Sequence, residues 1–205
     1  MKPLLQLAAI LALPAAAAIV DRIAVTVAGR VITASDVETR LRLSAFQNSA
    51  APDFSAGSKK AAVQLLIDQR LIEKEMELGH YPLLDPGERA GLIPAFAAAS
   101  YRGSLDELDK ALGRAQLNRQ DLEDDLARQS ELLTFLTLRF RPAVQISDVE
   151  VERLYRESNQ QVPLEQVRPL IEQRISAERA DRQLEEWLAD QRKHSRVVYV
   201  DKELQ

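Results

Sequence analysis

Hydrophobic positions along this chain recur mostly at helical spacing, whereas its two ends carry short patterns typical of β-strands. Residues 23–28 are rich in β-branched side chains. Gly29 and Arg30 follow as a turn, and residues 31–33 are expected to form a second strand antiparallel to the first, which predicts a hairpin. Residues 197–200 are a second stretch typical of a strand. A hydrophobic strand without a partner promotes aggregation, so this strand is expected to pair with another. We therefore expect the two ends of the chain to meet in one small sheet.

Between these ends, apolar periodicity and capping residues predict a mostly α-helical chain. Several predicted helices begin with a capping box, in which a polar residue and an acidic residue three positions later satisfy backbone N–H groups. Ser35 with Glu38 is one such pair, and Asp85 with Glu88 is another. Pro94 lies inside the third helix, so we expect a kink or a later start there. With their capping residues included, the expected helices cover residues 35–46, 58–78, 85–100, 104–113, 118–140, 147–158 and 163–193.

The helix expected over residues 58–78 carries a wide apolar surface. Its hydrophobic residues fall into two stripes at helical spacing, and two stripes make a broader arc than the single face of a surface helix. The first stripe contains Val63, Leu66, Ile67, Leu71 and Leu78, and the second contains Leu65, Ile72 and Met76. We expect this helix to lie at the centre of the core.

The first 18 residues have the composition of a secretory signal peptide. Lys2 gives a positive start, and residues 4–13 form a nearly continuous apolar run before a stretch of small residues. Cleavage is expected near Ala17 or Ala18. The apolar run is shorter than the roughly 20 residues that cross a bilayer, and no later segment is apolar enough to span one. These features predict an exported protein with no membrane span.

Composition narrows the classes of partner and chemistry. The formal net charge of −4 argues against nucleic acid, whose binding proteins usually carry a basic face. The chain has no cysteine, so its stability must come from packing without disulfides. His80 and His194 have no second ligand at metal-binding spacing and lie at expected helix ends. We therefore expect no metal site and no cofactor.

A cluster of carboxylates near residue 121 is the strongest candidate for acid–base chemistry. Its members, Asp121, Glu123, Asp124 and Asp125, fall in the first turns of an expected helix. Negative charge is favourable at a helix N-terminus. We interpret the cluster as a solvated helix cap, and we expect no catalytic residue in this chain.

Four segments, in a fixed order along the chain, resemble a known family. They are the hairpin region 20–33, the helix start at Ser35 and Asp36, the helical segment 65–72 that ends at Gly79, and a short capped helix to Gly113 that precedes a long helix and the segment 146–155. This set resembles the N-terminal domain of the SurA family of periplasmic chaperones. The resemblance implies a multi-helix chaperone module over residues 19–159, with a C-terminal helix and strand over 160–205 that pack back on it.

In that family the segment 146–155 leads into a parvulin-type isomerase domain. Here no more than residues 157–162 lie between two expected helices, a length that is ordinary for a helix connection and far too short for a domain. Peptidyl-prolyl isomerase activity is therefore a disfavoured alternative. The resemblance implies instead an ATP-independent chaperone that binds unfolded outer-membrane or secreted polypeptides in an apolar crevice. A dedicated assembly subunit of an envelope complex is the other alternative, and a homodimer is left open.

A chaperone needs some exposed apolar surface with a polar rim. The third expected helix and its flank supply the candidates, because this region is Ala-rich and carries few charges after Arg89. The sequence-predicted peptide-binding residues are Leu92, Ile93, Phe96 and Tyr101. The sequence leaves open whether this surface is exposed or is covered by the C-terminal helix or a second copy. Phe54 is a separate candidate because it lies in a polar loop.

Overall fold

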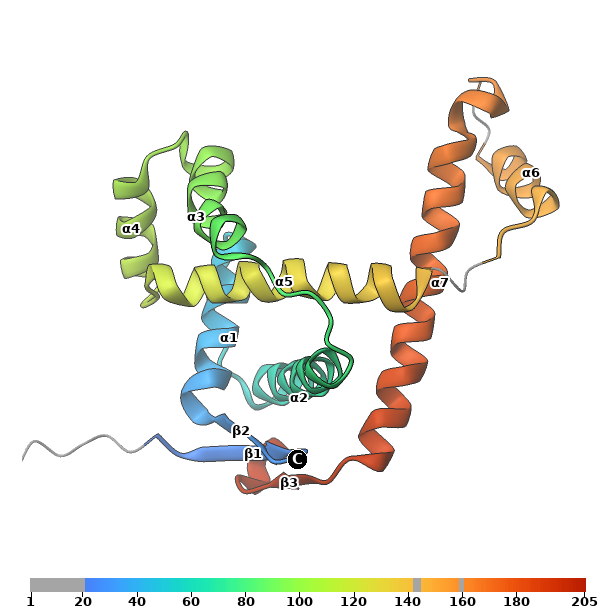
Figure 1. Ribbon diagram of the computed structural model, residues 1–205. Helices are drawn as coiled ribbons and strands as arrows, with labels where there is room; N and C mark the ends of the chain where they lie inside the picture. The colour runs from blue at the N-terminus through green and yellow to red at the C-terminus, as the bar shows by residue number, and fades with distance from the viewer. Residues whose placement is uncertain (1–20, 142–144, 159–160) are drawn as a thin grey trace, which may run out of the picture.

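The computed structural model describes residues 21–141, 145–158 and 161–205. The predicted signal peptide lies outside these residues. Within them the chain is mostly helical, with seven α-helices and one small antiparallel sheet (Figure 1). All seven expected helices are confirmed to within two residues at each end. The elements are β1 (Ile23–Val27), β2 (Arg30–Thr33), α1 (Ala34–Gln47), α2 (Ala56–Leu78), α3 (Pro86–Tyr101), α4 (Leu105–Arg114), α5 (Arg119–Arg139), α6 (Asp148–Glu157), α7 (Leu164–His194), β3 (Val197–Tyr199) and the short 3₁₀ helix η2 (Lys202–Leu204).

The sheet joins the two ends of the described chain, as the sequence predicts. Its strand order is β2-β1-β3, and both pairs are antiparallel. The turn consists of Ala28 and Gly29, one residue earlier than the predicted Gly29 and Arg30, and both have the positive φ angles of two-residue hairpin turns. Thr26, in the central strand, lies opposite Val31 on one side and Val198 on the other. The sheet therefore brings α7, which precedes β3, back to the first half of the chain.

The first helix begins two residues earlier than the Ser35 capping box predicts. Thr33 is the last residue of β2, and its hydroxyl accepts a hydrogen bond from the backbone N–H of Asp36 at 3.1 Å. The Asp36 carboxylate accepts one in return from the Thr33 backbone N–H at 2.9 Å. The prediction of Ser35 with Glu38 is wrong because the extended end of β2 already has the geometry of a cap.

Pro94 neither ends nor delays α3. The helix is continuous from Pro86 to Tyr101, and it begins with the predicted box of Asp85 and Glu88. The expectation of a later start is therefore wrong. Pro94 is exposed, so its ring lies on the face of α3 that points away from the core.

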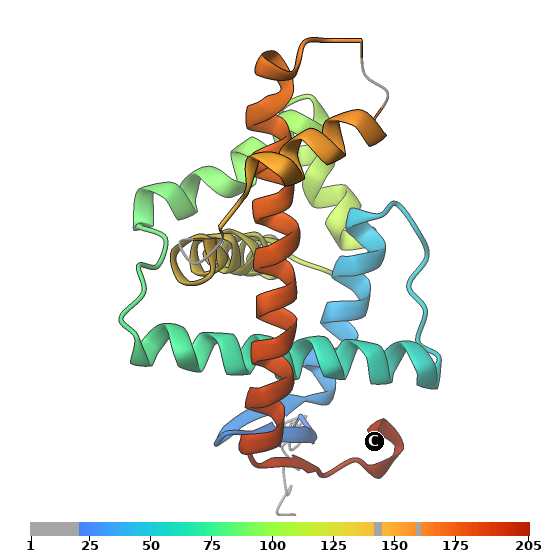
Figure 2. The ribbon, with the colours of Figure 1, turned by 90° about the vertical axis from the view of Figure 1, so that its right-hand side faces the viewer.

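Helix α2 lies at the centre of the larger of two hydrophobic cores. This core also receives the inner face of the sheet, the C-terminal half of α5 and the C-terminal half of α7. Figure 2 shows α7 lying across α2. Two residues of the expected stripes are exposed instead: Leu65 at 54% and Leu78 at 68%. Periodicity identified the apolar face, but neighbouring helices do not cover its whole length.

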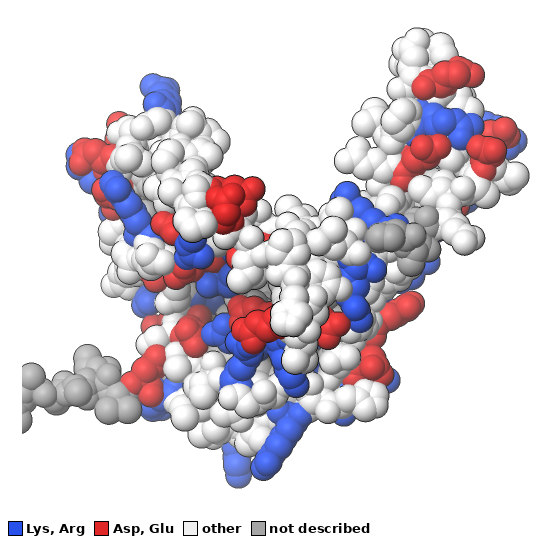
Figure 3. Space-filling view, viewed as in Figure 1, with Lys and Arg blue, Asp and Glu red and all other residues white. Residues whose placement is uncertain are grey.

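A second, smaller core joins α3 and α4 to the ends of α1 and α5. Its buried residues are Leu43, Ile93, Ala97, Leu108, Leu112, Leu117 and Leu122. On the other side of the molecule, α6 packs on the N-terminal half of α7, where Arg179 pairs with Glu150 at 2.6 Å. The space-filling view shows these parts as two lobes with a hollow between them (Figure 3). None of the helices in the described ranges is long and apolar enough to span a membrane.

Candidate functional site

Helices α2, α5 and α7 cross at the larger core and leave an apolar groove, which we call the α2–α5–α7 groove. It has a volume of about 270 Å³. Aliphatic side chains from all three helices form its floor, namely Leu65, Ile72, Met76, Leu132, Leu184 and Leu188. Polar side chains surround the floor, namely Arg40, Asp68, Gln69, Glu73, Asp125, Arg128, Gln129 and Glu131. An apolar floor within a polar rim is typical of a surface that binds another molecule.

The α2 side of the groove is the second apolar stripe of the sequence. Ile72 and Met76 are buried at its inner end, whereas Leu65, two turns earlier, is exposed. Exposure therefore increases along one stripe of one helix, which means that the groove is open at the Leu65 end.

An aromatic cluster fixes α7 against α5. Phe135 is fully buried, and its ring lies 5.6 Å from Trp187 on α7 and 5.7 Å from Phe140. Tyr81, which follows α2, approaches Phe135 edge-on with the ring centroids 5.1 Å apart. Such edge-to-face pairs stabilise beyond the area that they bury. The cluster thus holds one end of all three groove helices in a fixed arrangement.

An ion pair joins α2 to α7 at the rim of the groove. The Arg192 guanidinium donates through Nε to Asp68 Oδ1 at 2.6 Å, and its Nη2 donates to the other oxygen of the same carboxylate. This hydrogen bonding raises the pKa of Arg192 above its usual value. Two parallel hydrogen bonds make this contact directional, so the ion pair orients α7 relative to α2 in addition to attracting it.

Asp125 is the one buried charged residue among those that the structure describes, at 2% exposure. It accepts hydrogen bonds from Arg40 at 2.9 Å, from Gln47 at 2.8 Å and from Gln129 at 2.7 Å. The expectation that the whole carboxylate cluster is a solvated cap is therefore wrong for Asp125. Its position was a usable signal, because it lies three residues after the buried Leu122 on the same helix face.

The rest of the carboxylate cluster behaves as a helix start. Asp121 forms a capping box with Asn118, as its position predicts. Arg89 on α3 donates to Glu123 at 2.8 Å and also to Asp124, and these hydrogen bonds raise the pKa of Arg89. The cluster therefore joins α3 to α5, and its carboxylates are occupied by structural contacts.

The sequence-predicted binding residues do not line the α2–α5–α7 groove. Ile93 is 7% exposed and belongs to the smaller core, and Leu92 beside it is half-buried. Phe96 and Tyr101 are also half-buried, and both pack against Phe46 of α1. Peptide contact at Leu92, Ile93, Phe96 and Tyr101 stays a prediction, but Ile93 is covered by neighbouring helices rather than exposed.

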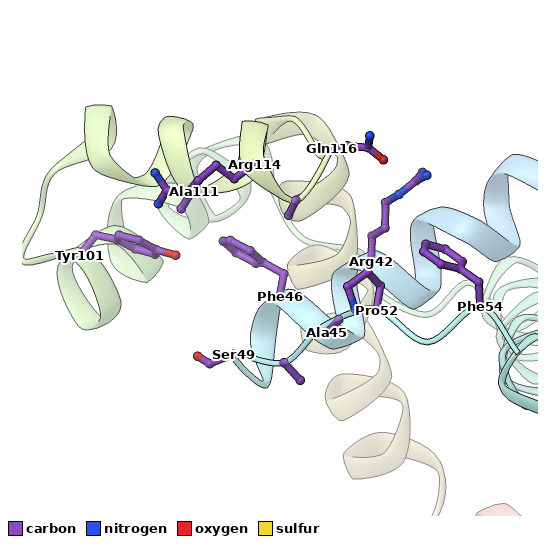
Figure 4. A pocket seen from close by; sticks show the side chains of 12 residues that line it. Arg42, Ala45, Phe46, Ser49, Pro52, Phe54, Tyr101, Ala111, Arg114 and Gln116 are labelled. Carbon is purple, nitrogen blue, oxygen red and sulfur yellow. The ribbon is translucent and has the colours of Figure 1, made fainter.

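Tyr101 lines a second cavity, which we call the Phe46 cavity. It lies between the end of α1, the loop that follows it and the ends of α3 and α4, and its volume is about 380 Å³ (Figure 4). Phe54, the loop aromatic singled out in the sequence, contributes to its wall. The lining consists of Arg42, Ala45, Phe46, Ser49, Ala50, Pro52, Phe54, Tyr101, Ala111, Arg114, Ala115 and Gln116.

The described residues bring together no group of three or more side chains that could hold a metal ion. His80 follows the end of α2 with a positive φ, and His194 ends α7, where its Nδ1 lies 2.9 Å from the Asp190 carbonyl oxygen. Both histidines are therefore where the sequence places them, at helix ends.

Comparison with protein-family models and with curated proteins finds no match for this chain. The similarity to the SurA N-terminal domain therefore continues to depend on the sequence segments described above.

Proposed function

We propose that this chain is an ATP-independent periplasmic chaperone that binds unfolded outer-membrane or secreted polypeptides in the α2–α5–α7 groove. The observation that carries the proposal is the open aliphatic floor that three helices share, with Leu65 exposed at its outer end. The predicted signal peptide supplies the compartment, and the family resemblance supplies the class of client.

The chemistry of the groove fits non-native polypeptide better than a specific small ligand. Its floor is aliphatic, and hydrophobic contact with such a floor does not depend on one ligand orientation. Its volume of about 270 Å³ suits apolar side chains of a short segment rather than a folded partner.

Affinity for such clients is expected to be low and broad. An unfolded segment loses chain entropy when it is bound, and this loss offsets part of the gain from burying apolar side chains. Short aliphatic segments of many sequences would satisfy the same floor, because hydrophobic contact is not directional. A chaperone benefits from this weak selectivity.

The absence of cysteine from the chain allows a clean test. Leu65→Cys places one thiol at the open end of the groove, and a bulky maleimide attached there would fill it. Leu78→Cys is the matched control, because Leu78 is an exposed leucine of the same helix that does not line the groove. Each labelled protein, without the predicted signal peptide, is mixed with an outer-membrane protein diluted from urea, and aggregation is followed by light scattering.

The unlabelled proteins and the labelled Leu78→Cys variant are expected to suppress aggregation. The labelled Leu65→Cys variant is expected to lose most of this suppression while its circular dichroism spectrum stays unchanged. If the chain in excess gives no suppression, or if the adducts at both positions act equally, the proposed function is wrong.

A further inference from the structure

The Phe46 cavity differs from the groove in that its described lining includes three aromatic rings and two arginines but no carboxylate. We propose that it binds a carboxylate attached to an aromatic or other apolar group, as found in a polypeptide segment that carries both. The carboxylate would come from a chain terminus or from an acidic side chain next to an aromatic residue. This inference rests on the proposed function only in taking a polypeptide as the ligand.

Stacked rings form the apolar part of the cavity. Phe46 and Tyr101 lie nearly parallel, with an angle of 10° between their planes and 6.4 Å between their centroids. Phe96 supports Phe46 from α3 at 6.2 Å. Phe54 adds a third ring to the wall itself, from the loop after α1. Flat, rigid side chains of this kind bind other rings and apolar groups at little cost in conformational entropy.

Two arginines give the cavity a positive charge. In Figure 4, the Arg114 side chain extends toward Tyr101 on one side of Phe46, and Arg42 rises beside Phe54 on the other. The Arg42 guanidinium lies 5.4 Å from the centre of the Phe54 ring, a distance at which a cation and a ring attract. No acidic side chain is present among the described residues that line the cavity.

Only one of the two lining arginines forms an ion pair within the described ranges. Arg42 pairs with Glu38, one turn earlier on α1, at 3.1 Å. Lys110 on α4 pairs with Asp106, whereas Arg114 on the same helix makes no ion pair with any residue in the described ranges. Arg114 thus has donors available in the cavity. A guanidinium offers two parallel N–H groups that match the two oxygens of a carboxylate.

The size of the cavity fits this ligand. Its volume of about 380 Å³ falls within the range of about 300–1,000 Å³ that is usual for ligand sites. The chain as a whole carries a formal net charge of −4, so overall attraction cannot account for carboxylate binding. Any preference for an anion must therefore come from the arginines of the cavity.

Three small probes test the proposal by backbone amide NMR of the chain without its predicted signal peptide. N-acetyl-phenylalanine carries a terminal carboxylate, N-acetyl-phenylalanine amide is its neutral equivalent, and N-acetyl-glutamyl-phenylalanine amide carries the carboxylate on a side chain. We expect at least one of the acids to shift resonances around Phe46 and Tyr101, with an affinity about fivefold to tenfold higher than the neutral amide, as one charge-assisted contact allows. A larger shift with the first acid indicates a chain terminus, and with the second an acidic side chain.

Arg114→Gln should reduce the affinity for the preferred acid to that for the neutral amide, and Arg114→Lys should restore part of it. Arg102→Gln is the matched control, because Arg102 is an exposed arginine near Tyr101 that does not line the cavity. Equal affinity for acids and amide, or an unchanged affinity in a folded Arg114→Gln protein, would overturn the proposal. These readouts are independent of the adduct at Leu65→Cys, so failure here and failure of the groove proposal can be told apart.

Discussion

The α2–α5–α7 groove and the Phe46 cavity are two hollows of similar size, and they differ in the charged side chains that line them. Charged side chains surround the groove, but its acidic Asp68 and Asp125 are occupied by arginines of the protein itself. In the Phe46 cavity the lining arginines face no lining carboxylate among the described residues. Paired carboxylates such as these leave the aliphatic floor to apolar partners, whereas an available cation selects for an anion.

Helix α1 serves both hollows because of its periodicity. Arg40 lines the groove and Arg42 lines the cavity, although they are only two residues apart. At 3.6 residues per turn, two positions correspond to a rotation of about 200°, so these side chains leave opposite faces of the helix. One arginine therefore helps to bury Asp125, while the other borders an aromatic wall.

The largest effect that separates the two regions is expected for Phe135→Ala. Phe135 is fully buried and contacts Tyr81, Phe140 and Trp187, so its removal leaves a cavity where the three groove helices meet. Substitutions of this kind cost about 3–5 kcal/mol of unfolding free energy. Urea denaturation followed by circular dichroism measures this loss, and hydrogen exchange should show the largest rate increase in α7.

Leu108→Ala is the matched control for that experiment, because Leu108 is equally buried in the smaller core. It should destabilise α3 and α4 and leave client binding at the groove unchanged. If Leu108→Ala abolishes client binding in a folded protein while Phe135→Ala does not, the functional region has been placed on the wrong side of the molecule.

A smaller effect is expected for Asp125→Asn, which alters the connection between the two regions. The carboxylate accepts hydrogen bonds from α1 and from its own helix, and an amide group of the same shape leaves at least one of these donors without a partner. We expect a loss of about 1–3 kcal/mol in unfolding free energy, measured by urea denaturation.

Asp124→Asn is the control for the buried position, since Asp124 is adjacent in sequence but partly exposed. Its cost should stay below about 1 kcal/mol, as for other pairs near the surface. Equal losses of unfolding free energy for Asp125→Asn and Asp124→Asn would show that burial does not determine how much these hydrogen bonds stabilise the protein.

The smallest effect is expected for Asp68→Asn at the groove rim. The pair with Arg192 is partly exposed, so solvent screens it, and a loss of about 0.2–1 kcal/mol is expected. The change should nevertheless speed hydrogen exchange in the last turns of α7, because the pair orients this segment. A loss above 2 kcal/mol, about twice the upper end of that range, would mean that this pair is part of the core rather than a rim contact.

The fold followed from the sequence to a large extent, because its signals are local. Capping residues such as Asp85 and Asn118 placed helix starts correctly, and the unpaired strand at 197–199 led to the correct partner in β1. Thr33 was missed as a cap because strand and helix meet there without a loop, so the residue has both roles.

The candidate site was harder to predict from sequence, because it depends on how far one helix covers another. The stripe that contains Leu65, Ile72 and Met76 was recognised, but periodicity could not show which of these residues the neighbouring helices cover. For the same reason the sequence left open whether Ile93 is exposed or covered, and the structure buries it in the smaller core with residues of α1, α4 and α5. The burial of Asp125 depends on partners from α1, far away in the sequence.

Photo-crosslinking from α2 tests the central claim most directly. Leu65→Cys and Leu78→Cys are each labelled with a benzophenone maleimide, mixed with an unfolded outer-membrane protein and irradiated, and the crosslinked client is quantified. If the groove holds the client, the yield from position 65 will exceed the yield from position 78 several-fold, with crosslinks to apolar client segments. Equal yields, or a higher yield from position 78, would contradict the account.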